Sequence, residues 1–344
     1  MIQEPIERSV PNRESRQEHG GNVDAGATIF FPAMRLFLGV DGGQSSTTAL
    51  VGDETGRVIG KGRGGPCNHA AASEGRANLE RAVLDSVGAA CAEAGLDPAG
   101  VRFEAACFGM SGGPEDKRAI LSQLLTIDLL LVTTDAEIAL AGATESGRGI
   151  VVIAGTGSIA LGRNDSGRTA RAGGWGYIFG DEASAFDIVR QAVRAIVRTE
   201  EGWGPATTLR ASLLDATGAP DSGHLLHEFY SPEWPRDRIA RLAPRVDGAA
   251  AAGDPVAIEI LNSAAVQLAT LAASVRVHLW RPDDAVSVAY SGGVFHSRRV
   301  LERFRVLVEL DSGNRCIPAR YGPAEGALRE ACRAAGVRPH TNEG

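Results

Sequence analysis

The sequence lacks long apolar runs and clusters of basic residues. Its apolar runs, such as Ile127–Val132 with Asp128 inside it, are far shorter than the roughly 20 residues that cross a bilayer. Acidic residues outnumber basic ones by 42 to 35, and no basic cluster offers a footprint for a phosphate backbone. We therefore expect neither a membrane nor a nucleic acid as partner.

Paired cysteines are also missing. None of the five cysteines stands two or four residues from another, so zinc-ribbon, thioredoxin-like and ferredoxin-like spacings are excluded. The odd count and the lack of a signal peptide predict free thiols in a cytoplasmic protein. These cysteines are Cys67, Cys91, Cys107, Cys316 and Cys332.

The chain of 344 residues is long enough for two modest domains. A hydrophobic share of 44% with 22% charged residues is typical of a globular protein. Residues 1–33 differ from the rest of the chain. They contain prolines, mixed charges and a pair of glycines, and they show no apolar periodicity. This composition predicts a disordered N-terminal extension.

Glycine is abundant, with 43 residues that fall in short clusters. Two clusters each join a pair of short β-rich runs, which predicts two hairpins with tips rich in glycine and hydroxyl groups. The first joins runs at 36–40 and 48–51, and the second joins runs at 149–154 and 159–163. Because the hairpins lie about one domain apart, we expect an internal duplication with two related domains facing one cleft. The tips are Gly42, Gly43, Gln44, Ser45 and Ser46, and Gly155, Thr156, Gly157 and Ser158.

Other segments show helical or strand patterns. The spacing of apolar residues predicts helices at 79–94, 116–125, 136–143, 184–199 and 323–335, and a mainly helical region at 205–278. Short β-rich runs predict strands at 58–61, 105–110, 129–134 and 285–290, with a last edge strand at 306–310.

The two tips have the chemistry of an anion site. Backbone N–H groups freed by glycine, beside Ser and Thr hydroxyls, bind anionic oxygens, and two facing tips would hold a polyphosphate from both sides. An ordinary pair of hairpins is the alternative. The P-loop motif, the Rossmann spacing and the protein-kinase motifs are all absent.

Three segments carry a resemblance to a known superfamily. Leu38–Thr47 resembles the first phosphate motif of the sugar kinase, actin and heat-shock chaperone superfamily, Ile153–Ser158 its second, and Tyr290–Phe295 its adenosine motif. Within it, the chain is similar to the N-acetylglucosamine kinase group, often catalogued as the BadF/BadG/BcrA/BcrD ATPase family, from about residue 34 to 337. The supporting segments are Gly65–His69, Thr133–Ala136, Ala172–Gly176 and Gly180–Ala185.

The resemblance implies an α/β protein of two ribonuclease-H-like (actin-like ATPase) domains with an interdomain cleft. One would span residues 34–145 plus the C-terminal helix at about 323–337, and the other residues 146–320. It also implies a kinase that uses ATP and Mg²⁺ to phosphorylate a hydroxyl of an amino sugar. N-acetylglucosamine is the favoured substrate, and glucosamine and N-acetylmuramic acid are the alternatives. A homodimer is implied by the resemblance alone.

Two aspartates carry the implied chemistry. Asp135 would accept the proton of the attacking sugar hydroxyl, although an Asp in this place also suits a helix N-cap. Asp41 would orient Mg²⁺ through water, although a turn-forming aspartate is the alternative. In the second tip, the backbone at Thr156 and Gly157 would meet the β- and γ-phosphates.

The substrates would occupy further loops. Gly292 and Gly293 would let adenosine approach the backbone, or would form an ordinary turn. Asn68 and Asp181 would bind sugar hydroxyls, with a turn and a helix cap as their alternatives. The remaining candidates are Ser111, Gly174 and Trp175, and the last of these could instead be a hydrophobic plug.

Two positions depart from the family pattern. Ala183 stands where the family more often has glycine, and Ala70 stands where animal N-acetylglucosamine kinases have a tryptophan that shapes the sugar pocket. One alternative function is an ATPase activator of a 2-hydroxyacyl-CoA dehydratase-type enzyme, which needs cysteine pairs in the second domain. Another is a non-catalytic nucleotide- or sugar-binding regulator, which Asp135 argues against.

Overall fold

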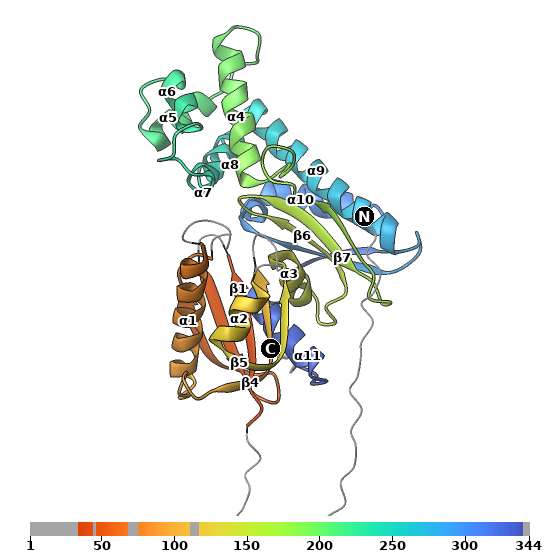
Figure 1. The fold of residues 1–344 in the computed structure, drawn as a ribbon. Helices are drawn as coiled ribbons and strands as arrows, with labels where there is room; N and C mark the ends of the chain where they lie inside the picture. The colour runs from red at the N-terminus through yellow and green to blue at the C-terminus, as the bar shows by residue number, and fades with distance from the viewer. Residues whose placement is uncertain (1–33, 44–45, 68–74, 111–116, 340–344) are drawn as a thin grey trace, which may run out of the picture.

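The protein forms two α/β units, each built on a five-stranded sheet and stacked one above the other in Figure 1. The computed structural model describes residues 34–43, 46–67, 75–110 and 117–339. The expectation for residues 1–33 lies outside these ranges.

The first sheet has the strand order β3-β2-β1-β4-β5. Helices α1 and α2 cover one face, and α11 covers the other. Because β1 pairs antiparallel with β2 and parallel with β4, the first glycine tip follows the end of a central strand. The elements are β1 (Phe37–Gly42), β2 (Thr47–Gly52), β3 (Val58–Gly64), β4 (Arg102–Met110), β5 (Thr126–Thr133), α1 (Gly75–Glu93), α2 (Arg118–Leu124) and α11 (Pro323–Ala334).

The second sheet repeats this plan in the order β10-β9-β6-β7-β8. Its β6 pairs antiparallel with β7 and parallel with β9, as β1 does with β2 and β4. The internal duplication predicted from the two hairpins is therefore confirmed. The strands are β6 (Gly149–Ala154), β7 (Ser158–Arg163), β8 (Thr169–Gly173), β9 (Val286–Ser291) and β10 (Asn314–Pro318).

Helices cover the second sheet and extend above it (Figure 1). The longest is α9 (Pro255–Leu279), which packs on β6, β7 and β8 and buries Leu261, Ala265 and Leu268 in the core of this unit. Within the described ranges, α9 alone has the length and hydropathy of a membrane span, a test that core helices also pass. The apolar runs in the sequence do not reveal α9 as a long apolar helix, because Glu259 interrupts its apolar stretch. The others are α4 (Ala185–Glu200), α5 (Leu209–Thr217), α6 (Ser222–Glu228), α7 (Arg236–Ala240), α8 (Ala243–Ala251), α10 (Arg298–Val308) and a 3₁₀ turn at Gly293–His296.

The strand expected at 306–310 is wrong. Alternating apolar residues there predict a strand, but residues 306–308 end α10, and the edge strand is β10. The helix buries Val300, Phe304 and Val308, which stand four residues apart on one face. Burial of this face decides the structure. Strand β8 is an edge strand whose sequence, TARAG, has little β-propensity and gave no signal.

Helix α3 (Asp135–Ala143) lies between the two sheets. Ala136 and Leu140 pack against Val151 and Leu161 of the second sheet, while Ile138 packs toward α11 and the first sheet. The residue at the start of α3 therefore lies where the two units meet.

Candidate functional site

The second hairpin tip, Gly155–Ser158, is held by the turn that precedes α4. Ser158 donates its N–H to Oδ1 of Asp181 over 3.2 Å and its hydroxyl to the carbonyl of Glu182 over 2.6 Å. Ala185 donates its N–H to the carbonyl of the first tip residue over 2.8 Å. Hydrogen bonds from both ends of the turn thus fix the shape of the tip.

This turn is strained. Asp181 and Ala183 have φ angles of 58° and 61°, and in the described ranges no other residue except glycine has a positive φ. Such strain is typical of functional sites. Ala183 is also the position at which the resembling family more often has glycine, and the left-handed backbone explains why glycine suits it.

A cavity of about 480 Å³ opens beside the second tip. At its edge Gly292, with φ of 104°, crosses β6 so closely that a Cβ would lie 2.3 Å from the carbonyl oxygen of Ala154. The predicted phosphate tip and the predicted adenosine loop therefore line one space. The lining residues are Gly155, Thr156, Ala185, Ile188, Asp237, Ala240, Arg241, Ala243, Pro244, Asp247, Leu261, Gly293, Val294, His296 and Ser297.

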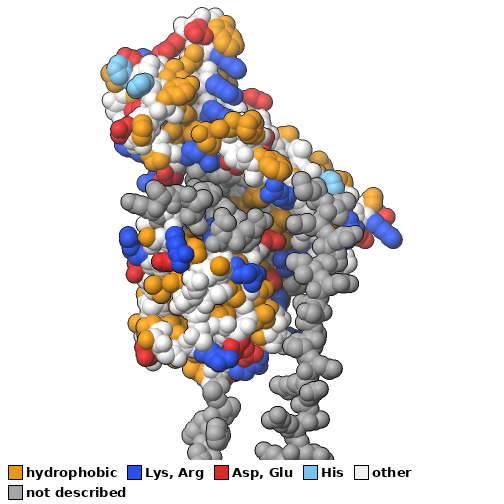
Figure 2. Space-filling view, in the orientation of Figure 1, with side chains coloured by type: hydrophobic (Ala, Val, Ile, Leu, Met, Phe, Trp, Pro, Cys, Tyr) orange, Lys and Arg blue, Asp and Glu red, His pale blue; other side chains and the backbone are white. Residues whose placement is uncertain are grey.

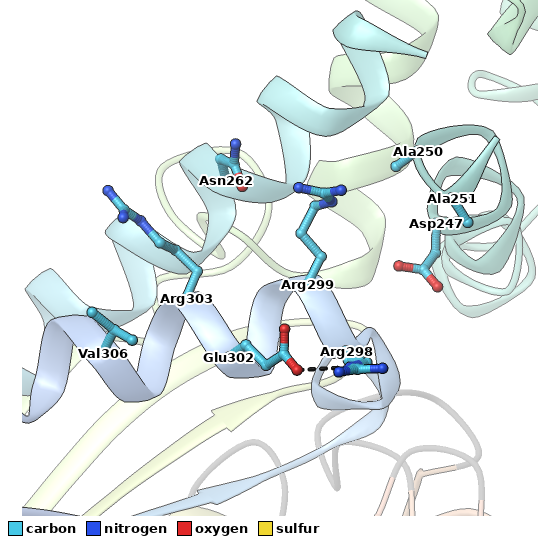
Figure 3. Close-up of a pocket in the computed structure, with 9 residues that line it drawn as sticks. All are labelled: Asp247, Ala250, Ala251, Asn262, Arg298, Arg299, Glu302, Arg303 and Val306. Atoms are coloured by element: carbon cyan, nitrogen blue, oxygen red, sulfur yellow. Dashed lines mark hydrogen bonds and ion pairs between the residues drawn. The ribbon is translucent and has the colours of Figure 1, made fainter. Parts of the chain in front are cut away.

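A slightly larger cavity of about 510 Å³ is lined by residues of α8, α9 and α10 (Figure 3). It shares Asp247 with the first cavity but contains no glycine of either tip. Arg298 and Glu302 form an ion pair of 2.6 Å within it. The glycine loops line the cavity of about 480 Å³ and do not line this one.

The first tip follows β1, and the structure describes it at Gly42, Gly43 and Ser46. Gly43 donates its N–H to the carbonyl of Ser46 over 3.0 Å, and Cys67 donates its N–H to the carbonyl of Gly43 over 2.9 Å. Gly42 pairs with Met110 of β4, and a Cβ there would lie 2.3 Å from the methionine sulfur. Gln44 and Ser45, also predicted for this tip, lie outside the described residues.

Asp135 begins α3 but is not its cap. The N-cap is Thr134, whose side chain and Glu137 form a reciprocal capping box. Asp135 instead accepts the N–H of Ala136 on Oδ1 over 2.8 Å. The N-cap alternative for Asp135 is therefore wrong, and its place at the junction of the two units needs another explanation.

Asp41 lies in β1 and Asp135 begins α3, and the charge of Asp135 acts on the Asp41 carboxyl group. Burial, and to a smaller extent the negative charge of Asp135, together raise the pKa of Asp41 to about 6. Two carboxylates facing one region suit a hard dication, which takes oxygen ligands and keeps several waters. The described residues contain no cluster of three or more potential metal ligands, so such an ion would be held by few protein groups.

The structure describes three of the five predicted sugar residues, Gly174, Trp175 and Asp181. Asp181 is buried, and its oxygens accept bonds from Ser158 and from Arg236, at 2.7 Å. It does not cap α4, because Ser184 does, so the cap alternative is wrong. Asn68 and Ser111 lie outside the described residues.

Trp175 is exposed rather than a plug. Its side chain is 62% exposed, with the Arg171 guanidinium 4.3 Å above the ring. Ile178 and Phe179 nearby are exposed as well, and Figure 2 shows hydrophobic side chains on the surface of the upper unit. Gly174, with φ of 73°, donates its N–H to the carbonyl of Ser158 over 3.0 Å, which places this segment beside the second tip.

Sequence reasoning missed Arg236, the partner of Asp181. It also missed helical residues that line the cavity of about 480 Å³, such as Asp237 and Asp247. None of them belongs to a glycine cluster or a spaced motif. Only the fold brings them to the hairpin.

A profile of the BadF/BadG/BcrA/BcrD ATPase family matches residues 38–331. The chain belongs to this family. The match includes both hairpins, Asp135 and the loop at Gly292, so the elements that build the site are those that the family shares.

Among family relatives, the N-acetylmuramic acid/N-acetylglucosamine kinase of Clostridium acetobutylicum is 32% identical over 286 residues, which cover 81% of this chain and 92% of the relative. The N-acetyl-D-glucosamine kinase of Dictyostelium discoideum is 29% identical, over 77% and 87% of the two chains. A solved structure from Chromobacterium violaceum, assigned as an N-acetylglucosamine kinase, superposes with a TM-score of 0.70 at 28% identity, over 86% and 99%.

Proposed function

We propose that the protein is an ATP-dependent kinase that transfers the γ-phosphoryl group to a hydroxyl of an amino sugar. The observation that carries this proposal is the shared cavity between the second glycine tip and Gly293, with Asp135 at the junction of the two units. Kinases of N-acetylglucosamine and N-acetylmuramic acid among the relatives support the substrate class.

The nucleotide would lie with its adenosine in the cavity of the second unit. Gly293 leaves its wall open, because no atom lies within 4 Å of the place where a Cβ would stand. The N–H groups of Thr156 and Gly157 in the second tip would meet the phosphates nearest the cavity, and the first tip would approach them from the other unit.

Asp135 would orient the attacking sugar hydroxyl and take its proton. Phosphoryl transfer needs little covalent assistance, so this carboxylate acts mainly by positioning the nucleophile. Asp41 would hold Mg²⁺ through water, and the paired carboxylates fit that ion. The ion would neutralise charge on the transferred phosphates.

The finer assignments follow the same resemblance. We propose that residues 34–145 with the C-terminal helix, and residues 146–320, are the two domains that enclose the substrates. We also propose that the protein is cytoplasmic and forms a homodimer. Size-exclusion chromatography with light scattering tests the dimer directly.

A coupled ADP-release assay over N-acetylglucosamine, N-acetylmuramic acid, glucosamine and glucose tests the function. ADP release that depends on one of the amino sugars is the expected result. Release that is equal without sugar would indicate a plain ATPase, and a brown, iron-containing protein after purification would indicate a dehydratase activator. The described cysteines are all buried free thiols, which gives the activator no support.

A further inference from the structure

Arg236, the first residue of α7, connects the predicted sugar carboxylate to the predicted phosphate tip. Its Nη2 donates to Oδ2 of Asp181 over 2.7 Å and lies 3.4 Å from the carbonyl oxygen of Thr156. The guanidinium lies over the rings of Tyr177 and Phe186, at 4.7 and 5.6 Å from their centroids. These contacts fix the guanidinium beneath the tip.

The position of Asp181 creates an electrostatic problem for a nucleotide. Its carboxylate lies against Gly157, where a Cβ would stand 2.8 Å from Oδ1, and it accepts the N–H of Ser158. An anion here would repel phosphates bound on the same tip, and its burial leaves little water to screen it. A cation on the other carboxylate oxygen removes most of this repulsion.

Helix α7 also borders the nucleotide cavity. Asp237 and Ala240, one and four residues after Arg236, line the cavity together with Thr156. Nε of Arg236 is buried and has no hydrogen-bond partner among the described residues. The same side chain therefore touches the sugar-side carboxylate and the tip, on a helix that forms the cavity wall.

We propose that Arg236 is a positioning residue that neutralises Asp181 beneath the second hairpin and so allows that tip to bind the phosphates of ATP. The inference rests on the proposed function, because it takes the second tip to be a phosphate site of ATP. It concerns nucleotide binding and does not depend on which sugar is phosphorylated. Loss of the guanidinium leaves a buried carboxylate beside the phosphates.

Isothermal titration of Mg-ATP, with no sugar present, tests this. Arg236→Ala is expected to weaken ATP binding about tenfold or more, since removing one partner of a buried ion pair leaves its charge uncompensated. Arg236→Lys keeps the charge and should recover part of the affinity. The matched control is Arg238→Ala on the same helix, where the guanidinium stacks on Trp234 at 3.9 Å. That variant should bind ATP within about twofold of the parent.

A charge rescue separates this role from simple stabilisation of the fold. In the Arg236→Ala background, Asp181→Asn is expected to restore ATP affinity several-fold, because no charge then needs neutralising. A purely structural arginine would predict no recovery, or a further loss. Thermal melts of each variant show whether it is folded, and steady-state assays separate KM for ATP from kcat.

The inference is overturned if Arg236→Ala binds Mg-ATP as the parent does, or if Asp181→Asn fails to restore affinity. Failure of the proposed function gives a different pattern. The parent would then bind Mg-ATP but phosphorylate no amino sugar, and the titrations of the variants would still decide the role of Arg236.

Discussion

Asp41 lies in β1 and Asp135 begins α3 directly after β5, and the charge of Asp135 acts on the Asp41 carboxyl group, although β4 separates the two strands. Burial and then the charge of Asp135 raise the pKa of Asp41 to about 6. Burial and the charge of Asp135 both disfavour the ionised form of Asp41. The ionised form of Asp41 therefore costs free energy when no cation is bound, and a bound dication would lower that cost.

Asp41→Asn should stabilise the metal-free protein in a pH-dependent way. The folded carboxyl group binds its proton more tightly than the unfolded one, so the free energy of unfolding falls as pH rises from 3.8 through about 6. The gap corresponds to about 3 kcal/mol. Urea unfolding with EDTA should show the variant more stable by up to that amount at about pH 8, and little different at about pH 4. A difference that does not change with pH would contradict this.

Asp135→Asn should lower kcat by about 10²- to 10⁴-fold, the range for loss of a general base. KM for ATP should change little, because Asp135 does not line the nucleotide cavity. Thr134→Ala is the matched control, since it removes the N-cap of α3 and should cost about 1 kcal/mol of stability with kcat nearly unchanged. Full turnover in the Asn variant would exclude the assigned role.

Gly292 and Gly293 should respond differently to alanine. A Cβ at Gly292 would lie 2.3 Å from a carbonyl oxygen and would need a left-handed φ, so its variant should lose several kcal/mol of stability. Gly293 has open space and should keep its stability, but the added methyl enters the cavity and should raise KM for ATP. Urea melts and ATP titrations of both variants check the contrast.

Ala183→Gly should stabilise the protein by up to about 1 kcal/mol, because a left-handed alanine costs about 1–2 kcal/mol and the loss of one buried methyl offsets part of the gain. Ala195→Gly, inside α4, is the opposite control and should destabilise by about 1 kcal/mol. Denaturant midpoints measure both. A large loss of stability at Ala183 would show that the strained turn needs its methyl group.

Much of this architecture follows from local sequence. The glycine and hydroxyl tips predict the two hairpins, and their repetition predicts the paired sheets. Residues 306–310 show the limit, because a period of two and a period of four are both present and only burial of Phe304 selects the helix. The ion pair between Asp181 and Arg236 could not be predicted, since it joins residues 55 positions apart through the fold.

The two chain segments that pass between the units meet at one place. The N–H groups of Arg320 and Tyr321, which lead into α11, bond the carbonyls of Ala143 and Gly142 at the end of α3, over 3.1 and 2.9 Å. There Gly326 lies so close to α3 that a Cβ would stand 1.9 Å from the carbonyl oxygen of Ile138. The backbone of α11 and of the residues before it contacts the backbone of α3 directly, so no change of side-chain rotamer can alter the distance between them. Where the chain passes between the two units, the distance between α3 and α11 is therefore set by backbone contacts and not by side chains.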